Sequence, residues 1–327
     1  MVPMLVLGLQ GSPKKNGSSD YLLKHFLTEI EKMGAEVQML DVARMDVKPC
    51  LGCGYCEKKG FCVIEDDDMA KTIYPLLRKA QVVVASSPVF FYSVTAQLKA
   101  LIDRTQALWS RKYRFRLSDP LSTTRKGFFL SMGGSRGKKL FDGIHLVASY
   151  FFDAIDAGFN GSLTFPGIET SADFQNKPQL NTQISETTQT LMSSLLERKR
   201  ILFLGKKNDI RTQMAEVLTQ YQAGNRFHVV TTGNEPGREF HSSVSEAMQA
   251  VGIDMAFHLP QSRARAIHEY RADIIISMSA DIEIPANPHV TTRVWDLPEP
   301  RHTSFESMVQ LREQIRGNIK KLEAISK

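Results

Sequence analysis

The chain has 327 residues, of which 42% are hydrophobic and 23% charged, and its formal net charge is +6. This balance is ordinary for a folded globular protein and excludes a disordered, collagen-like or coiled-coil chain. No apolar run approaches the roughly 18 residues that a membrane span needs, and the first residues lack the basic segment of a secretory signal. We therefore expect a cytoplasmic protein of about two domains that binds neither membrane nor nucleic acid, because the charge excess is too small for a nucleic-acid surface.

Strand and helix signals alternate along the first 199 residues. Short apolar runs predict strands at 4–9, 36–40, 81–86, 127–132 and 161–165. Amphipathic stretches predict helices at 19–33, from 68 onward, at 140–152 and at 182–198. Because strands joined by helical crossovers pair in parallel, we expect an α/β domain with a doubly wound, five-stranded parallel sheet.

The alternation starts again after the charged run at 197–200. Strands are expected at 201–204, 228–231, 273–278 and 291–295, and helices at 212–221, 242–251 and 305–325. We place the domain boundary near residue 199. The first domain then covers 1–199, and a second α/β domain with a four-stranded parallel sheet covers 200–327.

The loop at 11–19 (GSPKKNGSS) joins the first strand to the first helix. Such residues leave backbone N–H groups available, and the start of the helix adds positive potential, so the loop suits a phosphate group. It has neither the G-x-G-x-x-G pattern of dinucleotide sites nor the G-K-[ST] ending of NTPase loops. An ordinary loop in which Ser18 or Ser19 caps the helix is the alternative.

Two further strand ends belong to the same edge of the predicted sheet. Residues 87–92 (SPVFFY) follow the third strand, and residues 131–135 (SMGGS) follow the fourth. The carboxyl ends of parallel strands meet at one edge, where ligands bind. A phosphate cradle, an aromatic wall and a floor of small residues would suit a flat ring with a phosphate tail, although aromatic residues also serve as core.

All four cysteines lie close together, at Cys50, Cys53, Cys56 and Cys62, in the spacing C-x2-C-x2-C-x5-C. Four clustered thiols in a cytosolic chain indicate a metal or redox site rather than a disulfide framework. Two successive C-x2-C steps are more typical of a [4Fe–4S] cluster than of zinc. Zinc, an empty thiol set and a disulfide stay open as alternatives.

These motifs together resemble one family. The loop at 11–19, the segment 87–104 (SPVFFYSVTAQLKALIDR) and residues 131–134 are similar to the NADPH-dependent FMN reductase and iron–sulfur flavoprotein group, and residues 49–69 resemble its cluster loop. The resemblance implies a flavodoxin-like fold, FMN, a [4Fe–4S] cluster on the four cysteines and a homo-oligomer. The FMN contacts that it implies are Ser12, Lys14, Asn16, Gly17, Ser18, Ser19, Pro88, Val89, Phe90, Phe91, Ser131, Gly133 and Gly134.

Residues 201–216 resemble the start of low-molecular-weight phosphotyrosine phosphatases and arsenate reductases, in which a strand leads through C-x5-R-[ST] into a helix. The residues retained at an oxyanion site of this kind are Asn208, Arg211 and Thr212. The nucleophile position holds Gly205, and no cysteine follows Cys62, so we expect neither phosphatase nor arsenate reductase activity. The second domain is interpreted either as a structural remnant or protein-contact domain, or as an oxyanion sensor.

The combination predicts an FMN-dependent oxidoreductase that passes electrons between FMN, the cluster and an external carrier such as a ferredoxin or NAD(P)H. No residue is assigned a catalytic role. The alternatives are an NAD(P)H-dependent FMN or quinone reductase without a cluster, and a flavin-based sensor. The run at 111–116 (RKYRFR) is expected to be a solvated loop, and it is a candidate docking site for an acidic electron-transfer protein.

Overall fold

The computed structural model describes residues 4–205, 210–232, 242–258, 271–282, 284, 289–298 and 303–325. Contacts between Cα atoms divide the chain into two units. The first unit comprises Pro3–Arg116 and Thr124–Ser193, and the second takes Leu117–Thr123 and Ser194–Lys327. Among the described helices, none combines the length and the apolar character needed to cross a bilayer.

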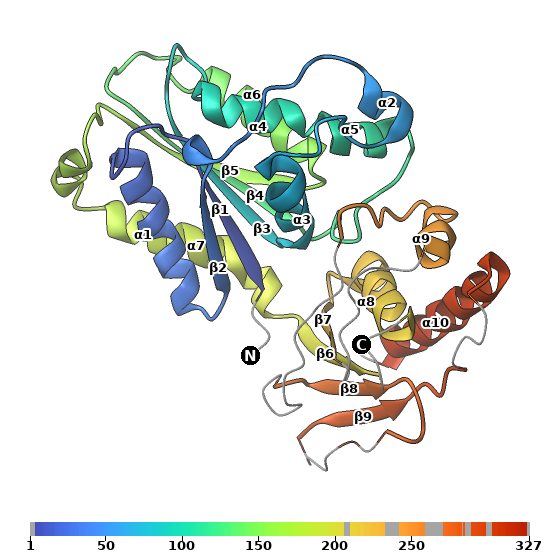
Figure 1. The fold of residues 1–327 in the computed structure, drawn as a ribbon. Coiled ribbons are helices and arrows are strands. Elements are labelled where there is room, and N and C mark those ends of the chain that lie inside the picture. The colour runs from blue at the N-terminus through green and yellow to red at the C-terminus, as the bar shows by residue number, and fades with distance from the viewer. Residues whose placement is uncertain are drawn as a thin grey trace. The chain divides into compact units, whose positions relative to one another are not determined.

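The first unit is built on a five-stranded parallel sheet with the strand order β2-β1-β3-β4-β5 (Figure 1). Its strands are β1 (Leu5–Gln10), β2 (Glu36–Asp41), β3 (Val82–Pro88), β4 (Lys126–Gly133) and β5 (Gly158–Pro166). Every residue of β1 is buried and β2 is only half-buried, because central strands are covered on both faces while an edge strand is not. The predicted five-stranded doubly wound sheet is confirmed.

Helices cover both faces of this sheet. One face carries α1 (Ser18–Lys32) and α7 (Leu180–Leu196), and the other carries α3 (Tyr74–Lys79), α4 (Ala96–Arg104) and α6 (Asp142–Ala154) (Figure 1). The remaining helical segments are α2 (Tyr55–Lys59), α5 (Gln106–Tyr113), the π-helix η2 (Met69–Ile73) and the short turns η1 (Val42–Arg44) and η3 (Ser171–Asn176). The helix α1 buries Leu22, Phe26 and Ile30 at helical spacing, as its sequence pattern predicts.

The expectation of a solvated loop at 111–116 is wrong for its first part. Helix α5 continues to Tyr113, and Arg111 is buried. Its guanidinium lies over the Phe61 ring at 4.8 Å, and its Nη1 donates to the Gly60 carbonyl oxygen at 3.3 Å. These two partners compensate the burial of the charge, which composition alone does not reveal.

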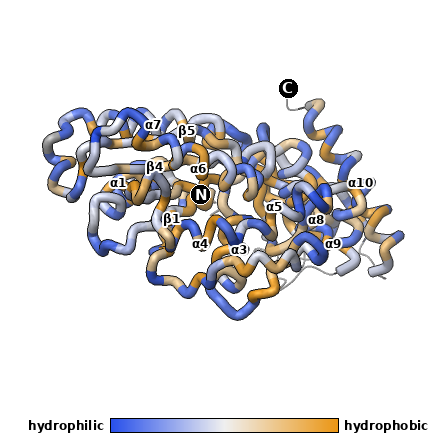
Figure 2. Tube along the Cα trace, turned by 90° about the horizontal axis from the view of Figure 1, so that it is seen from above, coloured by the Kyte–Doolittle hydropathy of each residue, from blue (hydrophilic) through white to orange (hydrophobic). Residues whose placement is uncertain are grey.

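The second unit contains a four-stranded parallel sheet, as predicted, and its strand order is β7-β6-β8-β9. Its strands are β6 (Lys199–Leu204), β7 (Phe227–Thr232), β8 (Ile274–Ser277) and β9 (Thr291–Val294), and its helices are α8 (Ile210–Ala223), α9 (Ser242–Gln249) and α10 (Phe305–Ile325). Polar and apolar residues alternate along α10 (Figure 2), which buries Met308, Leu311, Ile315, Ile319 and Leu322 in the core.

The short segment Leu117–Thr123 belongs to the second unit, which its place in the sequence does not predict. Its attachment is made through the backbone. The Ser118 N–H donates to the Gly252 carbonyl oxygen at 2.8 Å, and the Ser118 carbonyl oxygen accepts from the Asp254 N–H at 2.8 Å. Backbone pairing of this kind depends on no particular side chain, so no local sequence signal marks it.

Gly127 in β4 lets the Phe152 ring of α6 lie directly on the sheet, since a Cβ atom at this position would be 2.2 Å from a ring carbon. We expect Gly127→Ala to lower the free energy of unfolding of the first unit by about 1–3 kcal/mol, because the ring or the strand must shift. The control is Gly158→Ala in the neighbouring β5, where a Cβ atom would meet nothing closer than 3.5 Å. Denaturant unfolding followed by circular dichroism measures both variants, and equal losses would contradict this account.

Candidate functional site

Three loops meet at the carboxyl edge of the first sheet, after β1, β3 and β4. The Gly11 N–H donates to the Ser86 carbonyl oxygen at 2.8 Å, which joins the first loop to β3. The Val89 N–H donates to the Met132 carbonyl oxygen at 2.9 Å, which joins the second loop to β4. The structure therefore brings together the three segments from which the sequence predicts an FMN site.

The first loop leads into α1, which begins at Ser18. Within the described residues no side chain caps this helix at Gly17, so its first N–H groups face the loop without a side-chain acceptor. Ser12, Ser18 and Ser19 are buried, whereas Lys14 and Asn16 are exposed. Asn16 has a φ of +53°, a left-handed conformation that asparagine tolerates.

Two of the predicted serines already have partners in this loop. The Ser19 hydroxyl accepts from Gln10 Nε2 at 3.3 Å, and the Ser12 hydroxyl oxygen accepts from the Lys14 N–H at 3.2 Å. Each hydroxyl keeps its own proton for donation. The loop therefore offers two hydroxyl donors and the first N–H groups of α1, a donor set that suits an anion.

The second loop makes a tight turn with exposed aromatic side chains. Phe90 and Ser93 exchange both backbone hydrogen bonds at 2.9 Å, and Phe91 and Tyr92 between them have φ values of +47° and +62°. Bulky residues rarely adopt this conformation, and such strain is concentrated at functional sites. Phe90 is about half exposed and Phe91 fully exposed, so these rings border solvent rather than fill the core.

The third loop provides backbone rather than side chains. Ser131 is buried and its hydroxyl donates to the Ser87 carbonyl oxygen at 2.8 Å. A Cβ atom at Gly133 would lie 3.2 Å from Leu140, and one at Gly134 would lie 2.6 Å from the Glu169 carboxylate. Both glycines are therefore explained by close neighbours within the unit as well as by the predicted ring contact.

The cysteine loop lies between β2 and η2 and is shaped by glycines. Gly52, Gly54 and Gly60 have φ values of +63°, +66° and +75°, and the last two flank α2. Their left-handed conformation is available to glycine without cost, which lets the chain wind tightly. Cys50 and Cys53 are exposed, while Cys56 and Cys62 are half-buried.

All four cysteines line one hollow of about 370 Å³, together with residues that include Arg104 and Ala107. We call it the cysteine hollow. Within the described residues no three Cys, His, Asp or Glu side chains converge closely enough to hold a single metal ion. Four thiols around one open volume match the four-thiolate ligand set of a [4Fe–4S] cluster, and Glu57 and Asp103 line the same hollow.

Burial raises the pKa of the Cys56 thiol, and the nearby Ser110 hydroxyl opposes part of this effect.

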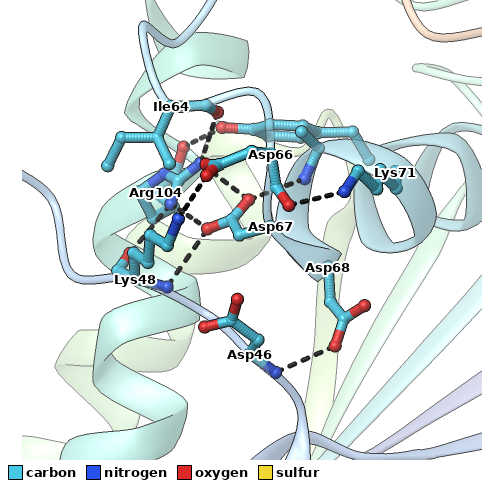
Figure 3. A network of polar contacts seen from close by, with 10 residues as sticks. Asp46, Lys48, Ile64, Asp66, Asp67, Asp68, Lys71 and Arg104 are labelled. Carbon is cyan, nitrogen blue, oxygen red and sulfur yellow. Dashed lines mark hydrogen bonds and ion pairs between the residues drawn. The ribbon is translucent and has the colours of Figure 1, made fainter.

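A buried ion pair lies beside the two ends of the cysteine loop (Figure 3). Arg104 Nη1 donates to Asp67 Oδ2 at 2.5 Å, and neither side chain has exposed area. Asp67 also accepts from the Lys48 N–H at 3.1 Å and from the Ala70 N–H at 3.1 Å. The Tyr74 hydroxyl donates to the Arg104 carbonyl oxygen at 2.5 Å.

This pair was not among the predicted site residues. Its only signals in the sequence are an acidic run at 66–68 and the Asp-Arg step at 103–104, both of which are typical of solvated surfaces. Around the same pair, Asp68 accepts from the Asp46 N–H at 2.8 Å. The acidic run therefore holds residues 46–48, which lead into the cysteine loop, through hydrogen bonds to their backbone N–H groups.

In the second unit, the arginine retained from the phosphatase motif donates to backbone carbonyl oxygens. Arg211 is buried, and its Nη1 donates to the Leu297 carbonyl oxygen at 3.0 Å and to the Met278 carbonyl oxygen at 3.5 Å. Thr212 is buried in α8, and Asn208 lies outside the described residues. The oxyanion site at these three residues stays a prediction.

Burial by itself raises the pKa of Asp67, but the hydrogen bonds from Arg104, Ala70 and Lys48 outweigh it, and the net pKa lies below the usual range. Stability from such a carboxylate is present above its unfolded pKa and is lost as the pH falls through the folded pKa. We expect Asp67→Asn to cost about 3–5 kcal/mol at pH 7, because it leaves the Arg104 charge buried and uncompensated.

The same variant should approach the parent protein as the pH falls below the unfolded pKa of aspartate, about 4. Urea unfolding at a series of pH values measures the difference. A gap that stays constant from neutral to acidic pH would show that the ion pair is not its cause.

Comparison with protein families matches residues 4–150 to the NADPH-dependent FMN reductase family and residues 200–326 to the low molecular weight phosphotyrosine protein phosphatase family. An iron–sulfur flavoprotein of Methanosarcina thermophila is 35% identical over 145 residues, which cover 43% of this chain and 71% of that protein. One of Methanocaldococcus jannaschii is 36% identical over 105 residues, 32% of this chain and 53% of that protein. An arsenate reductase of Brevibacillus brevis is 30% identical over 127 residues, 38% of this chain and 93% of that protein.

The matched segments thus span 53% and 71% of these two iron–sulfur flavoproteins, and nearly all of the arsenate reductase. They fall on separate parts of this chain, one before residue 150 and one after residue 200. Both resemblances inferred from the sequence are confirmed. The chain belongs to the iron–sulfur flavoprotein family, and its residues 200–326 form a further part that belongs to the low-molecular-weight phosphatase and arsenate reductase family.

Proposed function

We propose that this protein is an FMN-dependent oxidoreductase that passes electrons between FMN, a [4Fe–4S] cluster and an external carrier such as a ferredoxin or NAD(P)H. The observation that carries the proposal is that one unit contains both the edge where three loops are joined and the hollow that all four cysteines line. The iron–sulfur flavoprotein relatives support it. FMN exchanges electron pairs or single electrons, and an iron–sulfur cluster carries single electrons, so together they connect two kinds of carrier.

The first loop is proposed to hold the FMN phosphate through the first N–H groups of α1 and the hydroxyls beside them. The residues concerned are Ser12, Lys14, Asn16, Gly17, Ser18 and Ser19. The flat ring is assigned to the turn at Pro88, Val89, Phe90 and Phe91 and to the backbone at Ser131, Gly133 and Gly134. The turn supports this assignment, because it has exposed aromatic side chains at the sheet edge from which the first loop also leaves.

Cys50, Cys53, Cys56 and Cys62 are proposed as the cluster ligands, and none of them is assigned a role in bond making. The homo-oligomer and the cytoplasmic location expected from the sequence stay predictions. The second unit is proposed to have neither phosphatase nor arsenate reductase activity, since no cysteine follows Cys62. The carbonyl partners of Arg211 support a structural use of that residue.

Asn16→Asp tests the phosphate loop with a change of one atom and one charge. We expect the affinity for FMN to fall at least about tenfold (~1.4 kcal/mol), because the new carboxylate repels the phosphate. The affinity for riboflavin, which lacks the phosphate, should be unchanged. Quenching of flavin fluorescence in titrations of flavin-free protein measures both.

Asn160→Asp in β5 is the matched control, since Asn160 is also exposed and lies outside the three loops. It should leave the affinities for FMN and riboflavin as they are. Equal loss of both flavins in Asn16→Asp, or no loss of either, would contradict the proposed phosphate site.

Metal and flavin content test the cysteine site. Protein purified without oxygen should contain FMN and about four iron and four sulfide per chain, as a [4Fe–4S] cluster requires. Cys56→Ser should lose iron and sulfide while it keeps FMN. Zinc without sulfide would replace the cluster by a zinc site, and protein that takes up neither metal nor flavin would refute the proposal as a whole.

A further inference from the structure

The two ends of the cysteine loop converge on one side chain at the end of α4 (Figure 3). Arg104 Nη1 donates to the Lys48 carbonyl oxygen at 2.8 Å, and Nη2 donates to the Ile64 carbonyl oxygen at 3.0 Å. Lys48 lies two residues before the first cysteine, and Ile64 lies two residues after the last. One guanidinium therefore closes the segment 48–64 at its base.

Asp67 completes this arrangement. It accepts from both Nη atoms of Arg104, at 2.5 and 3.3 Å, and from the Lys48 N–H at 3.1 Å. A guanidinium presents several donors in one rigid plane, so it can serve two carbonyls and a carboxylate at once. An ammonium group on a flexible stem cannot reproduce that geometry.

Helix α4 connects this contact to the edge where FMN is proposed. At its other end, Thr95 is the N-cap, its hydroxyl donates to the Gly11 carbonyl oxygen, and its N–H donates to Ser87 Oγ at 3.1 Å. Because a helix rises 1.5 Å per residue, Ala96 and Arg104 lie about 12 Å apart along the axis. One short helix is thus attached to the phosphate loop at its start and to the cysteine loop at its end.

An independent observation links Arg104 to whatever fills the cysteine hollow. Arg104 lines that hollow, and its Nε is buried without an acceptor among the described residues. A buried N–H without a partner is costly, and native structures rarely leave one unexplained. A metal group on the four thiols would place sulfur acceptors and negative charge in the hollow that Arg104 lines.

We propose that Arg104, held by Asp67, is the positioning residue that keeps the cysteine loop preformed for its metal group and fixes that loop to α4. The inference deepens the proposed function and rests on it for the identity of the group. The loop needs such support because Gly52, Gly54 and Gly60 give its backbone wide conformational freedom. With both ends held, the thiols keep their places before the metal arrives.

Arg104→Gln tests the proposal against Arg125→Gln as a matched control. Arg125 is as deeply buried and donates to three carbonyl oxygens, of Ala80, Ile155 and Arg78, at 2.7–2.9 Å, but it does not line the hollow. In metal-free protein, amide hydrogen exchange over 48–64 should be at least tenfold faster in Arg104→Gln and unchanged in Arg125→Gln. In anaerobically loaded protein, iron release to a chelator should be several-fold faster in Arg104→Gln alone, with FMN content unchanged.

Arg104→Lys keeps the charge, but a lysine reaches only some of the acceptors. The rates of amide hydrogen exchange over 48–64 and of iron release should therefore lie between those of the parent and of Arg104→Gln. Arg104→Lys provides the same test if Arg104→Gln does not fold. Equal protection of 48–64 in the Arg104 and Arg125 variants would overturn the inference. A parent protein that takes up no iron, but whose loop still loosens in Arg104→Gln, would refute the proposed cluster and support the positioning role.

Discussion

The parallel register of β1, β3 and β4 is the constraint on which the rest of the first unit depends. Because β1 pairs with β3 and β3 with β4 in the same direction, the loops that follow them all leave at one edge. The first loop lies close to both β3 and α4, since a Cβ atom at Gly11 would lie 2.8 Å from Leu98 and 3.0 Å from the Ser86 carbonyl oxygen. Glycine at this position therefore lets the first loop reach β3 and lets α4 begin beside it.

The buried pair of Arg104 and Asp67 illustrates what a charged contact contributes inside a protein. Removing two charges from water is costly, and a buried salt bridge is weak support for overall stability. Here the cost is offset by carbonyl and N–H partners at Lys48, Ile64 and Ala70. The pair therefore fixes the positions of these groups, because the rigid guanidinium can donate to the carbonyl oxygens and the carboxylate together in only one arrangement.

The second unit shows a fold that persists without the nucleophile of its family. Its core is formed by residues of β6, β7, β8, α8, α9 and α10, and no cysteine is among them. Arg211 is held by the carbonyls of Leu297 and Met278, so the residue that clamps an oxyanion in the phosphatase motif has structural partners here. Fold and chemistry are separable in this way because packing involves most of a domain, whereas catalysis depends on a few groups.

The sequence by itself determined the order of the strands, the two sheets and both family resemblances, whereas no helix was predicted where α4 and α5 lie. Apolar runs such as the one in β1 and the amphipathic spacing in α1 report directly which side chains leave water, so strand and helix ends differ from the prediction by only a few residues. The placement of the three loops at one edge also followed, because parallel pairing dictates it.

Only the tertiary structure decided which polar residues support the cysteine loop. Arg104 and Asp67 are 37 residues apart, and no local pattern connects them. The burial of Arg111 and the attachment of Leu117–Thr123 to the second unit likewise depend on a distant ring and on distant carbonyl groups. Periodicity in a sequence records contact with water, whereas a buried charge or a backbone pair is decided by partners that only folding brings within hydrogen-bonding distance.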